Sequence, residues 1–114
     1  MADAIRIRAR LKDGVAEIHV LMPHPMETGM RSDADGRLVA AHHITDVKIS
    51  IAGRAALAAR MSLAVSQDPL LSFRFKGARV GDPVRVAWTD NRGEQRSDEI
   101  SISRFMVSKE FVDE

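Results

Sequence analysis

The chain has 114 residues, of which 17 are Lys or Arg and 16 are Asp or Glu, so its formal net charge is +1. This balance gives no electrostatic reason to expect a nucleic-acid partner or a membrane surface. The absence of cysteine excludes disulfides, thiol catalysis and thiolate metal sites within the chain. No apolar run is long enough to span a bilayer, and a chain of this length is expected to form one domain.

Two strands joined by a hairpin are predicted first. Apolar and basic residues alternate strictly from Ala4 to Lys12, which is typical of a half-buried strand. The basic side is either a solvated face that discourages edge pairing or an anion-binding strip, and we favour the solvated face. Asp13-Gly14 predicts the turn, and the apolar phase from Ala16 to Met22 predicts the second strand.

The next stretch, Leu21 to Arg31, is called the proline segment. Pro23 and Pro25 each fix φ and lack an N–H, so this segment is predicted to be an extended arm rather than helix or central strand. Gly29 supplies a place to turn. We interpret the segment as a partner-contact surface; the alternative is that it packs on its own domain with Met22 and Met26 in the core. The predicted partner-binding residues are Met22, Pro23, His24, Pro25, Met26, Glu27, Thr28, Gly29 and Arg31.

Histidines are the candidates for chemistry. His24 together with Met22, Met26 and Met30 offers imidazole and thioether groups of the kind that bind Cu(I), so a small copper-handling domain is the alternative function. His42 and His43 would point to opposite faces if they lay in a strand, and His19 is expected to be exposed. No phosphate loop, metalloprotease motif or nucleophile elbow is present, which predicts a chain that is not an enzyme and needs no cofactor.

The remaining chain predicts further short strands. A short strand is possible at Leu38 to Ala41, and Ile44 to Ile51 is a clearer one. The Ala-rich stretch after Gly53 looks locally helical, but strands on either side favour a strand at Ala55 to Arg60. Alternating segments that contain Phe73, Trp88 and Ile100 follow, with Leu70, Leu71 and Phe73 predicted to lie in the core rather than at an interface. Turns recur at short intervals without a strand–helix rhythm, so the predicted fold is an all-β, immunoglobulin-like antiparallel sandwich over residues 1–103, with a tail of unknown role at 104–114.

Several runs resemble the SoxZ subunit of the SoxYZ sulfur-carrier complex of bacterial thiosulfate oxidation. They are His24-Pro25-Met26-Glu27-Thr28-Gly29-Met30-Arg31, Asp33-Ala34-Asp35-Gly36, Ile44 to Gly53, Ser66 to Phe73, and Trp88-Thr89-Asp90-Asn91-Arg92-Gly93. The first run is long and contains two rare residue types, so it is far more specific than a spaced glycine pattern.

The resemblance implies an immunoglobulin-like sandwich that forms a heterodimer with SoxY, whose C-terminal arm carries the sulfur intermediates on a cysteine. The chain would be a non-catalytic subunit that binds and presents this partner and transiently meets other sulfur-oxidation enzymes, with homo-oligomers possible when it is isolated. The N-terminus shows no export signal, which by itself predicts the cytoplasm. The resemblance instead implies the periplasm, reached by export with a signal-bearing partner.

Overall fold

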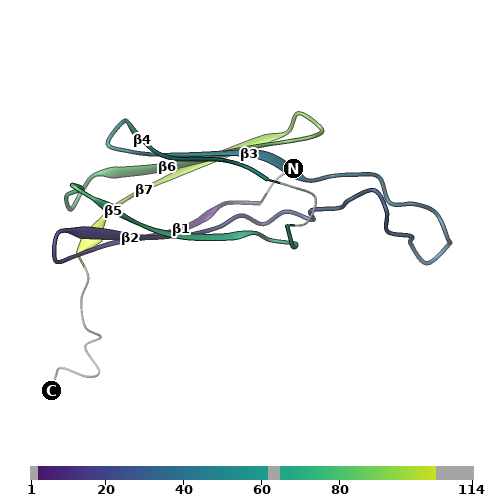
Figure 1. The fold of residues 1–114 in the computed structure, drawn as a ribbon, viewed down its shortest axis with the longest axis horizontal. Coiled ribbons are helices and arrows are strands. Elements are labelled where there is room, and N and C mark those ends of the chain that lie inside the picture. The colour runs from purple at the N-terminus through teal and green to yellow at the C-terminus, as the bar shows by residue number, and fades with distance from the viewer. Residues whose placement is uncertain (1–2, 62–64, 105–114) are drawn as a thin grey trace, which may run out of the picture.

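Two sheets stack to form a sandwich in the computed structural model, which describes residues 3–61 and 65–104 (Figure 1). All the regular secondary structure within these residues is β-strand. The strands are β1 (Arg6–Lys12), β2 (Val15–Leu21), β3 (Ile44–Ile51), β4 (Arg54–Arg60), β5 (Leu70–Lys76), β6 (Pro83–Asp90), β7 (Gln95–Ser101) and β8 (Ser103–Arg104).

The order of strands is β5-β2-β1-β8 in one sheet and β4-β3-β6-β7 in the other. All neighbouring strands are antiparallel except β1 and the very short β8, which are parallel. The chain changes sheets between β7 and β8 at Ile102, which is buried. The predicted all-β, immunoglobulin-like sandwich is therefore confirmed.

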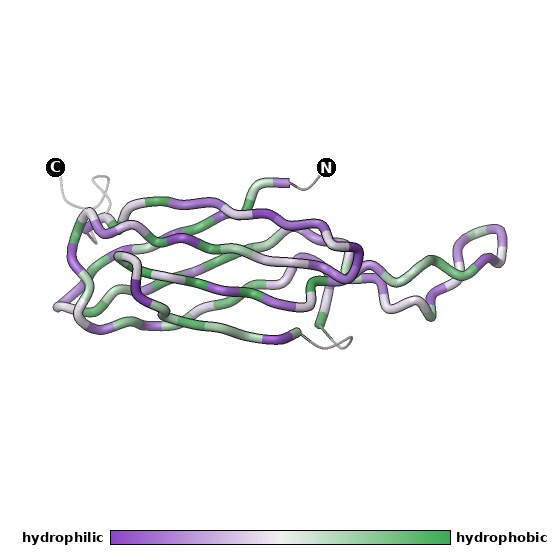
Figure 2. Tube along the Cα trace, turned by 90° about the horizontal axis from the view of Figure 1, so that it is seen from above, coloured by the Kyte–Doolittle hydropathy of each residue, from purple (hydrophilic) through white to green (hydrophobic). Residues whose placement is uncertain are grey.

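The core lies between the sheets because each strand turns its apolar phase inward. Ile18 and Val20 of β2 are fully buried, as are Ile51 of β3 and Val86 of β6, and polar residues alternate with them along the outer faces. Figure 2 shows this alternation of hydrophobic and hydrophilic residues along the strands. Burial of aliphatic surface between two half-polar sheets is thus what stabilises the fold.

Strand β4 confirms the strand predicted at Ala55 to Arg60. Its alanines favour helix locally, but pairing with β3 satisfies the backbone and lets Leu57 pack against the core. The short strand predicted at Leu38 to Ala41 is wrong, because only an isolated bridge from Leu38 to Ser32 forms there. The tail from residue 105 onward lies outside the described residues.

The prediction that Leu70 lies in the core is also wrong. Its side chain is 65% exposed, whereas the core prediction placed it inside with Leu71 and Phe73. Leu71 and Phe73 do pack against the core. Because successive side chains of a strand point to opposite faces, β5 cannot bury both Leu70 and Leu71.

No helix in the described part of the chain is long and apolar enough to cross a membrane.

The connection between β2 and β3, residues 22–43, is called the arm. It leaves one sheet, runs beyond the end of the sandwich and returns to the other sheet (Figures 1 and 2). Two antiparallel bridges, Glu27 to His42 and Ser32 to Leu38, hold its two sides together. The arm is therefore a long hairpin that projects from the sandwich.

Candidate functional site

The base of the arm is fixed by the loop that precedes β5. The Met22 amide donates to the Pro69 carbonyl at 2.9 Å, and the His24 amide donates to Asp68 Oδ1 at 2.9 Å. Asp68 returns its own amide to the His24 carbonyl, also at 2.9 Å. Pro23 and Pro25 have no N–H to satisfy, so the residue before each of them, Met22 and His24, supplies the amides that bond to this loop.

The His24 ring is buried and oriented on three sides. Its Nδ1 accepts the Met26 amide at 3.1 Å, so the proton of the neutral ring lies on Nε2, which is 3.1 Å from Asp90 Oδ2. The ring also meets the Trp88 indole edge-on, with centroids 5.0 Å apart and planes at 89°. His24 thus ties the outgoing side of the arm to the end of β6.

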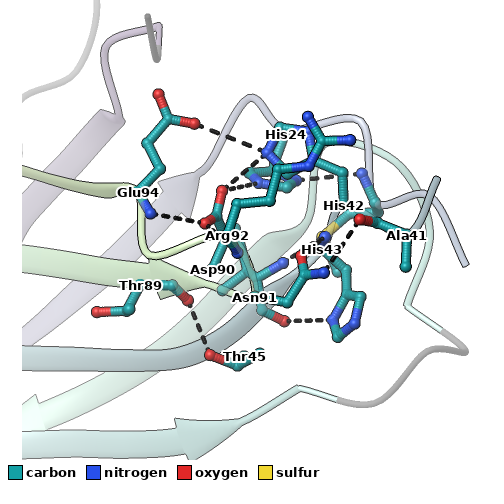
Figure 3. A network of polar contacts seen from close by, with 12 residues as sticks. His24, Ala41, His42, His43, Thr45, Thr89, Asp90, Asn91, Arg92 and Glu94 are labelled. Atoms are coloured by element: carbon teal, nitrogen blue, oxygen red, sulfur yellow. Dashed lines mark hydrogen bonds and ion pairs between the residues drawn. The ribbon is translucent and has the colours of Figure 1, made fainter.

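Asp90 receives hydrogen bonds on both carboxylate oxygens (Figure 3). Oδ2 accepts from His24 and from His42, whose Nε2 is 2.8 Å away. Oδ1 accepts the amides of Arg92 at 3.0 Å and Glu94 at 2.9 Å. Burial raises the pKa of Asp90, but these hydrogen bonds outweigh burial, and the net pKa lies below its ordinary value of 3.8.

His42 brings in the returning side of the arm. Its backbone exchanges two hydrogen bonds with Glu27, of 2.7 and 2.9 Å, while its ring stacks edge-on with His24 at 4.5 Å between centroids. The His42 Nε2 also lies 3.7 Å from Glu94 Oε1. Asp90 therefore joins both sides of the arm to the β6–β7 turn, and we call His24, His42 and Asp90 the clamp.

The clamp has the composition of a metal site, since two imidazole nitrogens and a carboxylate oxygen lie within 4.8 Å of one another. A cavity of about 280 Å³ beside it is lined in part by His24, His42 and Glu94. However, a ligating His24 Nε2 would have to lose its proton while Nδ1 still accepts the Met26 amide. The hydrogen bonds instead satisfy the clamp without an ion, which favours a structural role.

The three methionines proposed to join His24 at a copper site differ in their surroundings. Met22 is fully buried at the start of the arm, and Met26 Sδ accepts the Ile44 amide at 3.3 Å. Met30 is 80% exposed and lies beyond the Glu27–His42 bridge. Met30 therefore does not belong to a buried site around His24, and the Met26 sulfur already accepts a backbone hydrogen bond.

The predicted partner-binding residues divide into two groups. Met22, His24 and Met26 are buried, so they can support a contact surface but do not form it. The others are exposed or half-buried: Pro23, Pro25, Glu27, Thr28, Gly29 and Arg31. Their contact with a partner stays a prediction.

The outer half of the arm is ordered by short-range contacts. Asp33 Oδ1 accepts the amides of Asp35 and Arg37 at 2.9 and 3.0 Å, which shapes the turn at the tip. Arg31 binds both carboxylate oxygens of Glu27, at 3.0 and 2.8 Å. Met30 and Leu38 remain 80% and 69% exposed on this ordered hairpin.

Sequence reasoning misses Asp90 and the role of His42. In the sequence, Asp90 stands out only as part of the run from Trp88 to Gly93, although it continues the buried phase of Val84, Val86 and Trp88 along β6. A carboxylate in a core phase is costly unless it is hydrogen-bonded, so this phase is the available signal. No local pattern indicates that His24 and His42 would both lie against it.

The fold and site together define a class: an immunoglobulin-like sandwich that carries a clamped, projecting hairpin. The sequence profile described as "Sulphur oxidation protein SoxZ" matches residues 5–101. The chain therefore belongs to the SoxZ family and is a sulfur-oxidation protein.

Solved structures are similar in fold. A hypothetical protein, PH1083, from Pyrococcus horikoshii OT3 has a TM-score of 0.63 at 14% identity, with 88% of each chain covered. Reduced superoxide reductase (neelaredoxin) from Archaeoglobus fulgidus has a TM-score of 0.61 at 20% identity, covering 90% of this chain and 91% of that one. A mutant of the same reductase, also reduced, has a TM-score of 0.63 at 19% identity, with the same coverage. No curated protein sequence matches the chain.

Proposed function

We propose that this chain is the non-catalytic subunit of a sulfur-carrier heterodimer, and that its arm binds a SoxY-type subunit bearing the sulfur-carrying cysteine. Membership of the SoxZ family supports a place in sulfur oxidation. A chain without cysteine cannot itself carry sulfur on a thiol, so the covalent steps fall to a partner.

One structural observation carries the proposal: the arm is held by buried hydrogen bonds at its base and is exposed along its outer half. The clamp and the bridges order the arm before any partner arrives, which lowers the entropy cost of binding. Met30 and Leu38 then offer apolar side chains that the sandwich leaves exposed. Such side chains gain the most free energy when a partner covers them.

The test is co-purification of the chain with a co-expressed SoxY-type subunit. The double variant Met30→Glu/Leu38→Glu places two charges on the outer arm and should weaken binding at least about tenfold, because charged groups would have to be buried. Ala58→Glu/Val80→Glu is the matched control, since both of those residues are exposed on other parts of the sandwich. Unchanged binding by the arm variant, or equal loss in both variants, would contradict the proposal.

We also propose that the chain reaches the periplasm bound to that partner. The reason is the expected pairing with a signal-bearing subunit, not a feature of this chain. Fractionation of cells whose partner has lost its signal sequence should leave this chain in the cytoplasm. Periplasmic chain in such cells would show independent export.

A further inference from the structure

The outer face of the β5-β2-β1-β8 sheet gathers positive charge. In β1, the side chains of Ile7, Ala9 and Leu11 point into the core, so the residues that alternate with them point outward. The pairing of β1 with β2, and of β2 with β5, places these outward residues beside the outward residues of the other two strands. The exposed cations on these strands are Arg6, Arg8, Arg10, Lys12, Arg74 and Lys76. Along β1 they recur about 7 Å apart, twice the rise per residue.

One carboxylate faces them on these three strands. Glu17 lies between Arg10 and Arg74 in its row, and its Oε2 is 3.9 Å from Arg74 Nε. The whole chain has 17 cationic against 16 anionic side chains, so this face holds far more than an even share of positive charge. A single-sign field of this kind steers oppositely charged partners toward the surface.

Protection of a sheet edge accounts for only part of the basic face. Strand β1 is paired along its length with β2 on one side, but on the other side only Arg10 and Leu11 pair, with β8. Within the described residues, an open edge therefore lies beside Arg6 and Arg8 but not beside Arg10. Within the part of the chain that the structure describes, Arg6, Arg8 and Arg10 make no ion pair. These arginines repel one another, and the fold supplies them with no compensating ion pair within those residues.

The surroundings of the arginines favour a protein partner over a nucleic acid. A surface cavity of about 420 Å³ is lined by Arg6, Arg8 and His19 together with the apolar side chains of Leu21 and Leu70. Leu70, 65% exposed, sits beside the cations where a mixed acidic and apolar surface would fit. No outward residue of β1, β2 or β5 is Phe, Tyr or Trp, so His19 is the one aromatic side chain that these three strands present on this face, where single-stranded nucleic-acid sites use several.

We propose that this face, distinct from the arm, docks an acidic surface of a second protein. The inference rests on the proposed function in one respect: the second protein would be an enzyme that acts on the carrier complex. The two surfaces would then have different tasks. The arm would bind one partner permanently, and the basic face would bind the other transiently and in a salt-sensitive way.

The test uses the full chain and poly-L-glutamate as a probe of acidic protein surface. Arg6→Glu/Arg8→Glu/Arg10→Glu should lower its affinity for the probe at least about tenfold, and salt should weaken binding of the unmodified chain. Lys48→Glu/Arg60→Glu/Arg85→Glu reverses the same number of charges on the outer face of the other sheet and should keep most of the binding. Near-ultraviolet circular dichroism of the buried Trp88 checks that each variant is folded.

Two further probes and one binding partner separate the outcomes. Tighter binding to random-sequence duplex DNA or to phosphatidylglycerol vesicles than to poly-L-glutamate would overturn the assignment to a protein. Equal losses in the two triple variants would overturn the assignment to this face. The β1 variant should still co-purify with a SoxY-type subunit, and loss of that subunit would show that the face is not a second surface. If the unmodified chain fails to co-purify while probe binding behaves as expected, the proposed function fails and the basic face stands.

Discussion

The base and the outer half of the arm are parts of one hairpin, yet they are held by different kinds of contact. At the base, His24 and His42 converge on a buried carboxylate that belongs to another strand. Beyond the Glu27–His42 bridge, order comes from backbone bonds, the Asp33 turn and an exposed ion pair. The base should therefore control stability, and the outer half should be free to change without unfolding the domain.

The largest expected effect is at Asp90. Asp90→Ala removes the acceptor of four donors, two of them histidine rings that join the arm to the end of the core. We expect the free energy of unfolding to fall by roughly 3–5 kcal/mol, the range for breaking a buried charged network. Urea unfolding followed by Trp88 fluorescence measures the loss. A change below about 1 kcal/mol would show that the clamp does not hold the fold.

The same variant gives the expected pH dependence. Because the pKa of Asp90 is lower in the folded chain than its ordinary 3.8, its ionised form favours folding. That contribution is complete above pH 3.8 and is lost as the pH falls through the lower folded value. The stability difference between the unmodified chain and Asp90→Ala should therefore shrink as the pH falls below 3.8. A difference that grows in that acid range would contradict the lowered pKa.

Two glycines of the arm provide a matched comparison of smaller size. Gly29 has φ of 90° and a Cβ there would lie 3.3 Å from the Ala41 Cβ, whereas Gly36 has φ of 81° and open space around it. Alanine at either position adopts a strained backbone, at about 1 kcal/mol. Gly29→Ala should cost about 1 kcal/mol more than Gly36→Ala, because it must also move Ala41. Equal losses would show that the two sides of the arm adjust freely.

The smallest effect is expected at the exposed ion pair. Arg31→Met breaks both bonds to Glu27, which hold the pKa of Glu27 below its usual value. Because solvent screens an exposed pair, the unfolding midpoint should stay within experimental error. A nuclear magnetic resonance titration of Glu27 should show its pKa rising in the variant. A clear loss of stability would place the outer arm in the same structural unit as the base.

Much of the sandwich follows from local pattern. Alternation in β1, β2, β3 and β6 predicts which residues point inward, since the side-chain period of a strand is two. The neighbouring strands indicate the strand at Ala55 to Arg60 against its helical composition. Leu70 is misplaced by the pattern because neighbouring apolar residues do not reveal which of them takes the inward phase.

Local sequence patterns predict only part of the site. The proline segment and its histidine stand out in the sequence, but their division into buried anchors and exposed residues does not. That division depends on Asp90, which is 66 residues away from His24 along the chain. No local propensity connects positions so far apart.

Local sequence is enough to establish that the chain folds as an all-β sandwich, that it contains no thiol, and that two prolines keep the segment after β2 extended. Those outcomes depend on periodicity, composition and fixed backbone angles, which act over a few residues. Three-dimensional packing is needed to bring His24 and His42 together at Asp90 and to set the cations of β1 and β5 on one face. Both arrangements require strands distant in the chain to pair in one register, and that register is set by burying the whole core at once.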